Sequence, residues 1–269
     1  MRLATFVTSD GAVLAGEVRG EEVIALPGGR SVPDLLGLTG RPAAEGPAAE
    51  GRRFALAEIT LLAPYVPRLV AGVGLNYARH AAEGGHEPPG VPMIFLKGPA
   101  SVTAPGGPVV RPAGVRQLDY EGELAFIAGP GRSVIGYAVA NDVSARDFRE
   151  PTLVRQKAGD TFCPWGPWVT TADEVADPYA LMLRTLVNGE LRQEASTAEI
   201  IFRAGEILDA LSQTIRVQPG DLVLTGTPAG VGLLFDPPRL LVPGDVVRIE
   251  IDGLGAIEHR IVDESAGDA

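Results

Sequence analysis

Acidic residues alternate in the segment 119–124, which reads Asp-Tyr-Glu-Gly-Glu-Leu. On a strand, residues two apart share a face, so the carboxylates of Glu121 and Glu123 project to the same side. Two adjacent carboxylates repel each other unless solvent or a cation compensates their charge. Because Glu is rarely buried, this pair alone favours a polar strand end that faces water.

A third carboxylate follows the next run of strand-forming residues, at 135–140, and changes that interpretation. If this run pairs with the strand expected at 121–127, Asp142 comes close to both glutamates. Three oxygen ligands with no His or Cys suit a hard cation, Mg²⁺ or Mn²⁺ ahead of Ca²⁺, and leave coordination positions for water or substrate. The spacing therefore predicts a metal site at Glu121, Glu123 and Asp142.

The elements that must position these side chains are expected to be mostly short strands. The chain holds 34 Gly and 23 Pro, which fall between short apolar runs and favour strands and turns over long helices. The clearest helix is expected at 197–212, where Ser196 and Glu199 have capping-box spacing and one face is apolar. A shorter helix is expected from Asn76 to Glu83. The predicted fold class is α+β, mostly β.

The chain of 269 residues is long enough for one large domain with a small addition. The sequence Pro-Ala-Ala-Glu-Gly occurs in tandem at 42–46 and 47–51, a low-complexity linker to which we assign no function. We therefore expect a small N-terminal β module with its linker at 1–58 and the main, catalytic domain at 59–269.

Charge and composition exclude several classes of function. The formal net charge of −11 disfavours nucleic-acid binding, and an acidic metabolite would need a local positive centre such as a bound divalent cation. Cys163 is the only cysteine, so an intramolecular disulfide and a Cys-rich zinc site are excluded. No window approaches the roughly 20 apolar residues of a membrane helix, and the N-terminus lacks a signal-peptide core. We expect a cytoplasmic protein.

Six short motifs occur in the order expected of the fumarylacetoacetate hydrolase family, which the chain resembles from about residue 68 to 255. Each motif alone is only modestly specific, whereas six in register are highly specific. The resemblance implies a mixed β-sandwich roll and a homodimer. The motifs are Val-Gly-Leu-Asn-Tyr-Ala-Arg-His at 73–80, Phe-Leu-Lys at 95–97, the acidic segment 119–124, the segment 136–147, Val-Asn-Gly-Glu at 187–190 and Gly-Thr-Pro-Ala-Gly-Val-Gly at 226–232.

The resemblance assigns roles to residues at matching positions. It implies that the three carboxylates hold a divalent metal, and it maps a catalytic lysine onto Lys157, which without the family reads as a solvated loop lysine. Lys97 and Arg146 become candidates for binding a substrate carboxylate, although Arg146 is equally a candidate ion-pair partner. Thr227 corresponds to a substrate contact. Gly159 departs from the family, which commonly has a bulky residue there.

His80 and Glu83 are three residues apart, so on a helix they share a face and can touch. Family members that act on acylpyruvate-type substrates use such a pair to move a proton near neutral pH. The alternative is a surface histidine beside a solvated glutamate. His86 in a loop and His259 on a polar C-terminal strand receive no function, and Cys163 reads as a small buried hydrophobic residue.

The resemblance also implies the chemistry, in which a small 2-oxo acid chelates the metal and forms an enolate. Isomerisation, decarboxylation or C–C hydrolysis can follow. The segment 183–202 resembles the isomerase/decarboxylase branch of aromatic catabolism, which favours 2-hydroxyhepta-2,4-diene-1,7-dioate as substrate. The alternatives are an acylpyruvate or fumarylpyruvate hydrolase, an oxaloacetate decarboxylase or tautomerase, and a non-catalytic protein that binds a metal or metabolite.

Overall fold

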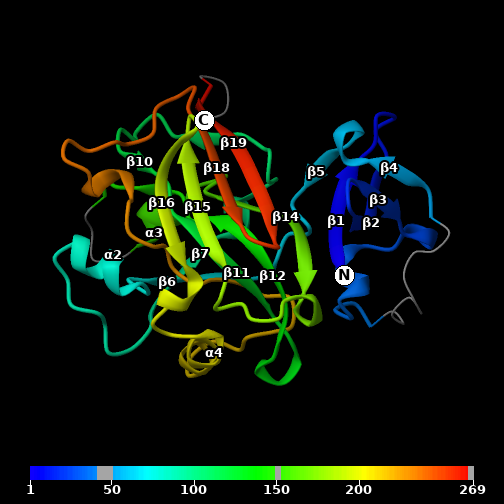
Figure 1. The fold of residues 1–269 in the computed structure, drawn as a ribbon, viewed down its shortest axis with the longest axis horizontal. Coiled ribbons are helices and arrows are strands. Elements are labelled where there is room, and N and C mark those ends of the chain that lie inside the picture. The colour runs from blue at the N-terminus through cyan, green and yellow to red at the C-terminus, as the bar shows by residue number, and fades with distance from the viewer. Residues whose placement is uncertain (41–50, 149–152, 266–269) are drawn as a thin grey trace.

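Strands dominate the molecule, and they form mixed sheets as the sequence predicts. The computed structural model describes residues 1–40, 51–148 and 153–265 (Figure 1). The strands of these residues are β1 (Arg2–Val7), β2 (Val13–Arg19), β3 (Glu22–Ala25), β4 (Arg53–Ala55), β5 (Thr60–Leu62), β6 (Val70–Gly74), β7 (Met93–Lys97), β8 (Val102–Thr103), β9 (Val109–Arg111), β10 (Leu118–Asp119), β11 (Gly122–Ala128), β12 (Val134–Asn141), β13 (Ser144–Ala145), β14 (Cys163–Thr171), β15 (Met182–Val187), β16 (Glu190–Ser196), β17 (Leu222–Leu224), β18 (Val246–Ile251) and β19 (Gly255–Asp263).

The helices are few and short. They are α1 (Val32–Leu35), α2 (Ala78–Glu83), α3 (Val154–Lys157) and α4 (Ala204–Ser212) in the described residues. No helix in these ranges is long and apolar enough to cross a membrane. The predicted α+β, mostly β class is confirmed.

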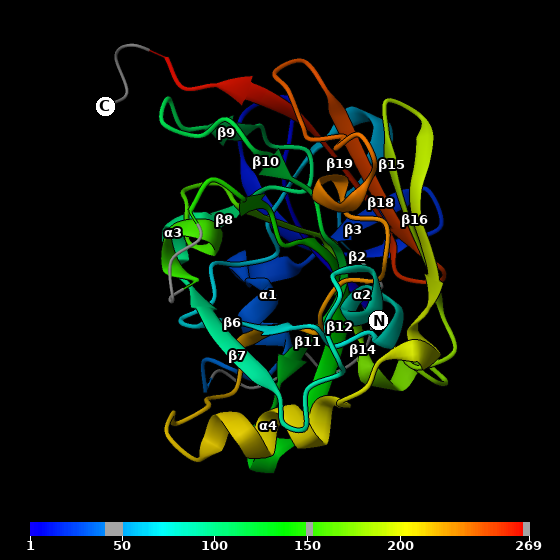
Figure 2. The ribbon, with the colours of Figure 1, turned by 90° about the vertical axis from the view of Figure 1, so that its left-hand side faces the viewer.

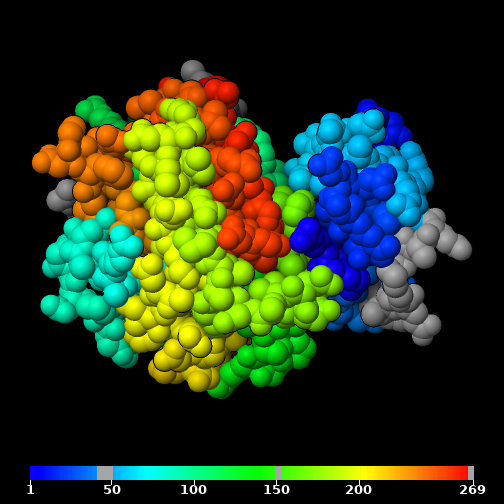
Figure 3. Space-filling model, in the orientation of Figure 1, coloured from blue at the N-terminus to red at the C-terminus, as the bar shows by residue number. Residues whose placement is uncertain are grey.

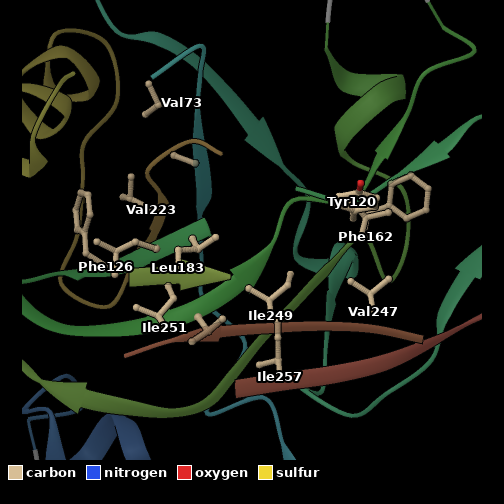
Figure 4. Close-up of a cluster of buried hydrophobic side chains, with 14 of the residues drawn as sticks. Val73, Tyr120, Phe126, Phe162, Leu183, Val223, Val247, Ile249, Ile251 and Ile257 are labelled. Carbon is tan, nitrogen blue, oxygen red and sulfur yellow. The ribbon is translucent and has the colours of Figure 1, made fainter. Parts of the chain in front are cut away.

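Two sheets pack face to face around the main core. The larger runs in the order β4-β3-β2-β1-β14-β12-β11-β17-β6-β7, and the smaller runs β16-β15-β18-β19-β9. Figure 4 shows their inner faces, where Phe126 and Val223 of the first sheet meet Leu183, Ile249 and Ile257 of the second. Each such buried side chain contributes roughly 1.5–3 kcal/mol, so this interface rigidly supports β11 and β12.

The N-terminal strands form a lobe beside the main body, as Figure 3 shows in blue and cyan. Strand β1 joins the large sheet by antiparallel pairing with β14, where Leu3 lies opposite Val169. Strand β5 also pairs with β1, so a strand of the lobe lies just beyond residue 58. The boundary at 58 stays a prediction, and the tandem repeat lies, except for Gly51, outside the described residues.

The helix expected at 197–212 begins later than predicted. Residues Thr197–Glu199 form a single 3-10 turn, and α4 starts only at Ala204. Between them, Asn76 binds the backbone, because its carbonyl and side-chain oxygens accept hydrogen bonds from Ile201 N and Phe202 N. These tertiary bonds replace the helical ones, and α4 packs below the large sheet (Figure 2).

Candidate active site

Antiparallel pairing of β11 with β12 brings the three predicted metal ligands together. Gly122 lies opposite Asn141, and Asp142 N donates to Glu121 O at 2.9 Å. Ligand oxygens of Glu121, Glu123 and Asp142 all lie within 4.8 Å of one another, and the three side chains are buried. The predicted strand pairing is confirmed, and it produces a compact cluster of carboxylates.

The charge of Glu123 is the least compensated in this cluster. Burial raises the pKa of its carboxyl well above the usual range, and repulsion from Asp142 and Glu121 raises it further. The backbone N of Gly226 donates a hydrogen bond to it at 2.6 Å, and no ion pair joins Glu123 to a cation within the described ranges. An oxygen-only donor set with excess negative charge fits a divalent cation such as Mg²⁺ or Mn²⁺.

Lys157 lies at the end of α3 with its ammonium among the carboxylates. Its Nζ donates to Glu121 Oε2 and to Asp142 Oδ2, each at 2.6 Å. Burial alone would lower the pKa of Lys157, but Asp142 and Glu121 raise it by more, so the amine is protonated. The residue is 5% exposed, which contradicts a solvated loop lysine.

The structure explains why a glycine, and not the bulky residue common in the family, occupies position 159. A Cβ there would lie 2.9 Å from the ring of Phe162, a buried core residue that occupies the space a larger side chain would need. Gly159 therefore accompanies Phe162 and leaves the predicted position of Lys157 at the cluster intact.

Arg146 forms the ion pairs that were one of its two predicted roles. Its Nη2 donates to Glu121 Oε1 at 2.6 Å, and its Nε donates to Asp119 Oδ2 at 3.0 Å. Asp119 also accepts hydrogen bonds from Gly232 N and Leu233 N, so it holds the loop that carries Thr227. Burial lowers the pKa of Arg146, but these two carboxylates raise it by more, and the guanidinium stays charged.

Lys97 is directed into the protein. Its side chain is 0% exposed, and its Nζ donates to Asp142 Oδ1 at 2.5 Å and to the carbonyl oxygen of Lys157. The ammonium thus ties Asp142, a predicted metal ligand, to the end of α3. The substrate contact expected of Lys97 stays a prediction, and the structure supports a positioning role beside it.

His80 and Glu83 meet on α2 as their spacing predicts. His80 Nδ1 lies 2.8 Å from Glu83 Oε1, and the side chains are 12% and 24% exposed. Glu83 Oε2 also accepts from Gly230 N at 2.9 Å, which fastens α2 to the loop that carries Thr227. Glu83 is an exposed residue, but its hydrogen bond to Gly230 N distinguishes the pair from a histidine beside a freely solvated glutamate.

A cavity of about 130 Å³ brings the predicted site residues to one place. Five of the nine predicted site residues line it, whereas Glu83, Lys97, Glu123 and Asp142 do not. The lining consists of Val73, Gly74, Leu75, His80, Met93, Phe95, Glu121, Arg146, Leu153, Gln156, Lys157 and Thr227. Charged groups at one end and apolar side chains around them suit a small anionic metabolite.

Several buried polar residues lie behind the cluster and are not predicted as site residues from the sequence. Asn141 Oδ1 accepts from Glu121 N, and Asn141 Nδ2 lies 2.9 Å from His259 Nε2. His259 is on a strand as expected but is 2% exposed, and burial lowers its pKa to about 3. The position of Asn141 beside Asp142 was the available signal for Asn141. Gln193 of β16 accepts from Gly122 N of β11 at 3.0 Å. For His259 and Gln193, nothing in the local pattern indicated a contact with β12 or β11.

For His86 and Cys163, to which we assigned no function from the sequence, the structure agrees with the prediction. His86 is exposed in the loop after α2. Cys163 is fully buried, and burial raises the pKa of its thiol to about 12, so it is inert as a nucleophile at neutral pH.

Comparison with known proteins gives consistent matches. The family model described as fumarylacetoacetate (FAA) hydrolase C-terminal matches residues 69–262. A mitochondrial oxaloacetate tautomerase of Xenopus laevis is 41% identical over 219 residues, which cover 76% of this chain and 69% of that protein. The 4-hydroxyphenylacetate degradation bifunctional isomerase/decarboxylase of Salmonella dublin is 39% identical over 241 residues, which cover 84% of this chain and 54% of that protein.

A solved structure agrees over nearly the whole chain. Maleylpyruvate hydrolase from Sphingobium sp. SYK-6, in complex with manganese(II) ion and pyruvate, has a TM-score of 0.78 and 32% sequence identity. The match covers 98% of this chain and 100% of that chain. The three proteins carry three different activities, so similarity indicates common ancestry more strongly than one reaction.

Proposed function

The chain belongs to the fumarylacetoacetate hydrolase family, and from that premise we propose a divalent-metal-dependent enzyme that moves a proton on a small 2-oxo dicarboxylic acid. The preferred substrate is 2-hydroxyhepta-2,4-diene-1,7-dioate, with isomerisation or decarboxylation as the outcome. The Salmonella relative, which carries an isomerase/decarboxylase name, supports this preference. The observation that most supports this proposal is a single cavity. It is lined by Lys157, Arg146 and His80, and it adjoins the carboxylate cluster.

The charge balance of the site supports an anionic substrate. Four carboxylates face three basic side chains, an excess of one negative charge, which a divalent cation turns into an excess of one positive charge. A substrate carboxylate then neutralises the site. The groups counted are Asp119, Glu121, Glu123 and Asp142 against Lys97, Arg146 and Lys157.

A cation held by the three carboxylates would supply a Lewis acid that polarises the 2-oxo group. The protein's own groups do the rest. The ammonium of Lys157 stabilises negative charge that develops on the substrate oxygen, at a position fixed by Glu121 and Asp142. The buried ring of Phe95 in the cavity wall shields the reacting carbons from water on its side.

His80 is the group that moves the proton. Glu83 lies against Nδ1, which leaves Nε2 to face a substrate carbon or water. Because Gly230 N fastens Glu83, the imidazole keeps one orientation relative to the loop that carries Thr227. The pair would serve proton return at a new carbon, which isomerisation requires, and equally the activation of water, which hydrolysis requires.

A second candidate is C–C hydrolysis of an acylpyruvate or fumarylpyruvate. The Sphingobium hydrolase with manganese and pyruvate favours it, since the same histidine could activate water. Tautomerisation or decarboxylation of oxaloacetate is the third candidate, favoured by the Xenopus relative. All three begin with an enolisable 2-oxo acid.

The test is a steady-state assay of purified protein with Mg²⁺ or Mn²⁺ and each substrate class. We expect tautomerisation of the dienedioate with the highest kcat/KM, and loss of turnover after chelation. Hydrolysis of acylpyruvates without action on the dienedioate would replace the first candidate by the second. Tight metal binding with no turnover of any 2-oxo acid would support a non-catalytic binding protein.

We also propose that the protein is a homodimer, as the family resemblance implies. Large apolar side chains are exposed near the cavity, among them Val91, Met93 and Val154, and a second copy would cover apolar surface of this kind. Light scattering at micromolar concentration tests this, and a monomer mass would contradict it. The cytoplasmic location stays a prediction.

A further inference from the structure

Gln193 connects the second sheet to the candidate active site. It lies on β16 opposite Thr185 of β15 and is 1% exposed. Its Oε1 accepts from Gly122 N at 3.0 Å, and its Nε2 donates to Thr227 Oγ1 at 2.8 Å and to Pro228 O at 2.9 Å. A single buried side chain of the second sheet thus binds two segments of the candidate site, one at Gly122 and one at Thr227–Pro228.

The orientation of this amide is fixed by its neighbours. A backbone N–H such as that of Gly122 can only donate, and a carbonyl such as that of Pro228 can only accept. The oxygen of Gln193 must therefore face Gly122 and its nitrogen must face Pro228. The reversed amide would place two donors together and two acceptors together, which a buried group does not tolerate.

The two segments that Gln193 holds are the ones that matter for binding. Gly122 lies between the metal ligands Glu121 and Glu123, and Thr227 lines the cavity. Thr227 Oγ1 also donates to Gly122 O at 3.0 Å, which closes a ring of hydrogen bonds through the amide of Gln193. The ring fixes the direction of the Thr227 hydroxyl and the position of the peptide between the two glutamates.

The close approach of the second sheet to β11 depends on the glycine at position 122. A Cβ at Gly122 would lie 2.2 Å from Thr185 Oγ1 and 3.3 Å from Gln193 Oε1, so any side chain there would push the second sheet away. Thr185 itself has no hydrogen-bond partner for its hydroxyl among the described residues. Of the paired residues Thr185 on β15 and Gln193 on β16, only Gln193 forms side-chain hydrogen bonds to the candidate site.

We propose that Gln193 is a positioning residue that sets both the metal affinity of the Glu121–Glu123 segment and the substrate contact of Thr227. The substrate part rests on the proposed function, whereas the metal part rests on the carboxylate cluster alone. Hydrogen-bonded partners behind metal ligands typically change affinity or activity by roughly 10-fold to 100-fold when removed.

The main variant is Gln193→Met, which keeps the length of the side chain and removes all three hydrogen bonds. Its matched control is Thr185→Val, at the facing position, which alters packing at the same place without removing a bond to the site. We expect Mn²⁺ affinity, measured by calorimetric titration, to fall roughly 10-fold in Gln193→Met and to change less than about two-fold in Thr185→Val. Equal affinity in Gln193→Met and the wild type would overturn the metal part.

A second variant, Gln193→Glu, separates the two roles and remains informative if the methionine variant misfolds. It keeps the acceptor for Gly122 N but replaces the donors to Thr227 and Pro228 by an acceptor, and the negative charge that it adds near Glu121 and Glu123 favours a bound cation. We expect Mn²⁺ affinity to be retained or raised while kcat/KM falls roughly 10-fold or more. Retention of both quantities would overturn the role toward Thr227.

A double-mutant cycle with Thr227→Val distinguishes positioning from general stability. If Gln193 acts through Thr227, Gln193→Met costs much less kcat/KM in the Thr227→Val background than in the wild type. Additive losses would contradict the proposal. Should the wild type turn over no 2-oxo acid, the proposed function fails, and the Mn²⁺ titrations of Gln193→Met and Thr185→Val still decide the metal part.

Discussion

The floor and the wall of the cavity are built differently. The floor is the carboxylate cluster with its basic partners at the ends of β11 and β12, and of these residues Glu121, Arg146 and Lys157 line the cavity. Its charges are buried, and Lys157 and Asp142 each bind two or more oppositely charged or polar groups. The part of the lining that we call the wall is the short helix α2, which contributes His80 and is fastened to Gly230 through Glu83, and both side chains are partly exposed. Charge is therefore fixed in the rigid core, whereas the proposed proton-moving group lies on an element with less support.

The largest effect is expected at the floor, from Glu123→Gln. Losing one of three charged ligands should weaken Mn²⁺ binding strongly and reduce kcat by about a thousand-fold, since a metal contributes several kcal/mol to the transition state. Without metal, the variant should unfold at the same or a higher temperature, because the wild-type carboxyl is buried among like charges. Calorimetric titration and thermal unfolding in chelator measure both.

A lower unfolding temperature of metal-free Glu123→Gln would contradict the charge argument. A matched control is Glu258→Gln, an exposed residue on β19, which should change neither metal affinity nor kcat. Together the two variants show whether the floor is organised for a cation or only for packing.

The next effect is expected at the wall, from His80→Gln. Loss of the proton-moving group should reduce kcat by roughly 100-fold to 10,000-fold. Mn²⁺ affinity should stay within about two-fold, because His80 is not among the three carboxylate ligands. His86→Gln, on the exposed loop after α2, is the control and should behave as the wild type in steady-state assays.

A smaller effect is expected from Glu83→Gln. The amide keeps a bond to His80 or to Gly230 N but removes the negative charge beside the imidazole, so we expect kcat to fall about 10-fold. An unchanged kcat in steady-state assays would show that Glu83 only fastens the wall.

The last effect concerns His259, behind the floor, and is expected in stability and not in kcat. Asn141 Nδ2 donates to His259 Nε2, since Asn141 Oδ1 accepts from Glu121 N, so the folded state needs a neutral imidazole. Burial lowers the pKa from 6.5 to about 3, so this contribution to stability is complete above pH 6.5 and is lost as the pH falls toward 3. By about pH 5 the loss is about 2 kcal/mol.

The variant His259→Gln keeps an acceptor for Asn141 and removes the titrating group. Urea unfolding at pH 7 and about pH 5 should show a shallower loss of stability in this variant than in the wild type. Identical pH dependence in the two proteins would contradict the assignment of a neutral buried His259.

The sequence by itself determined the features that depend on local spacing. Alternation along one strand placed Glu121 and Glu123 together, adjacency of the next strand added Asp142, and a three-residue separation joined His80 to Glu83. The two pairs follow from the periods of strand and helix, and Asp142 requires in addition only that two consecutive strands pair, so none of these relations depends on elements far apart in the chain.

Only the tertiary structure decided how the remaining side chains are used. Lys97 turns to Asp142, Asn76 delays the start of α4, and Gln193 reaches Gly122 across the interface between the two sheets. Each of these contacts joins residues far apart in the chain, and the packing of one sheet on another selects the partner. Local periodicity cannot carry that information, because it fixes the face a residue occupies and not what lies opposite it.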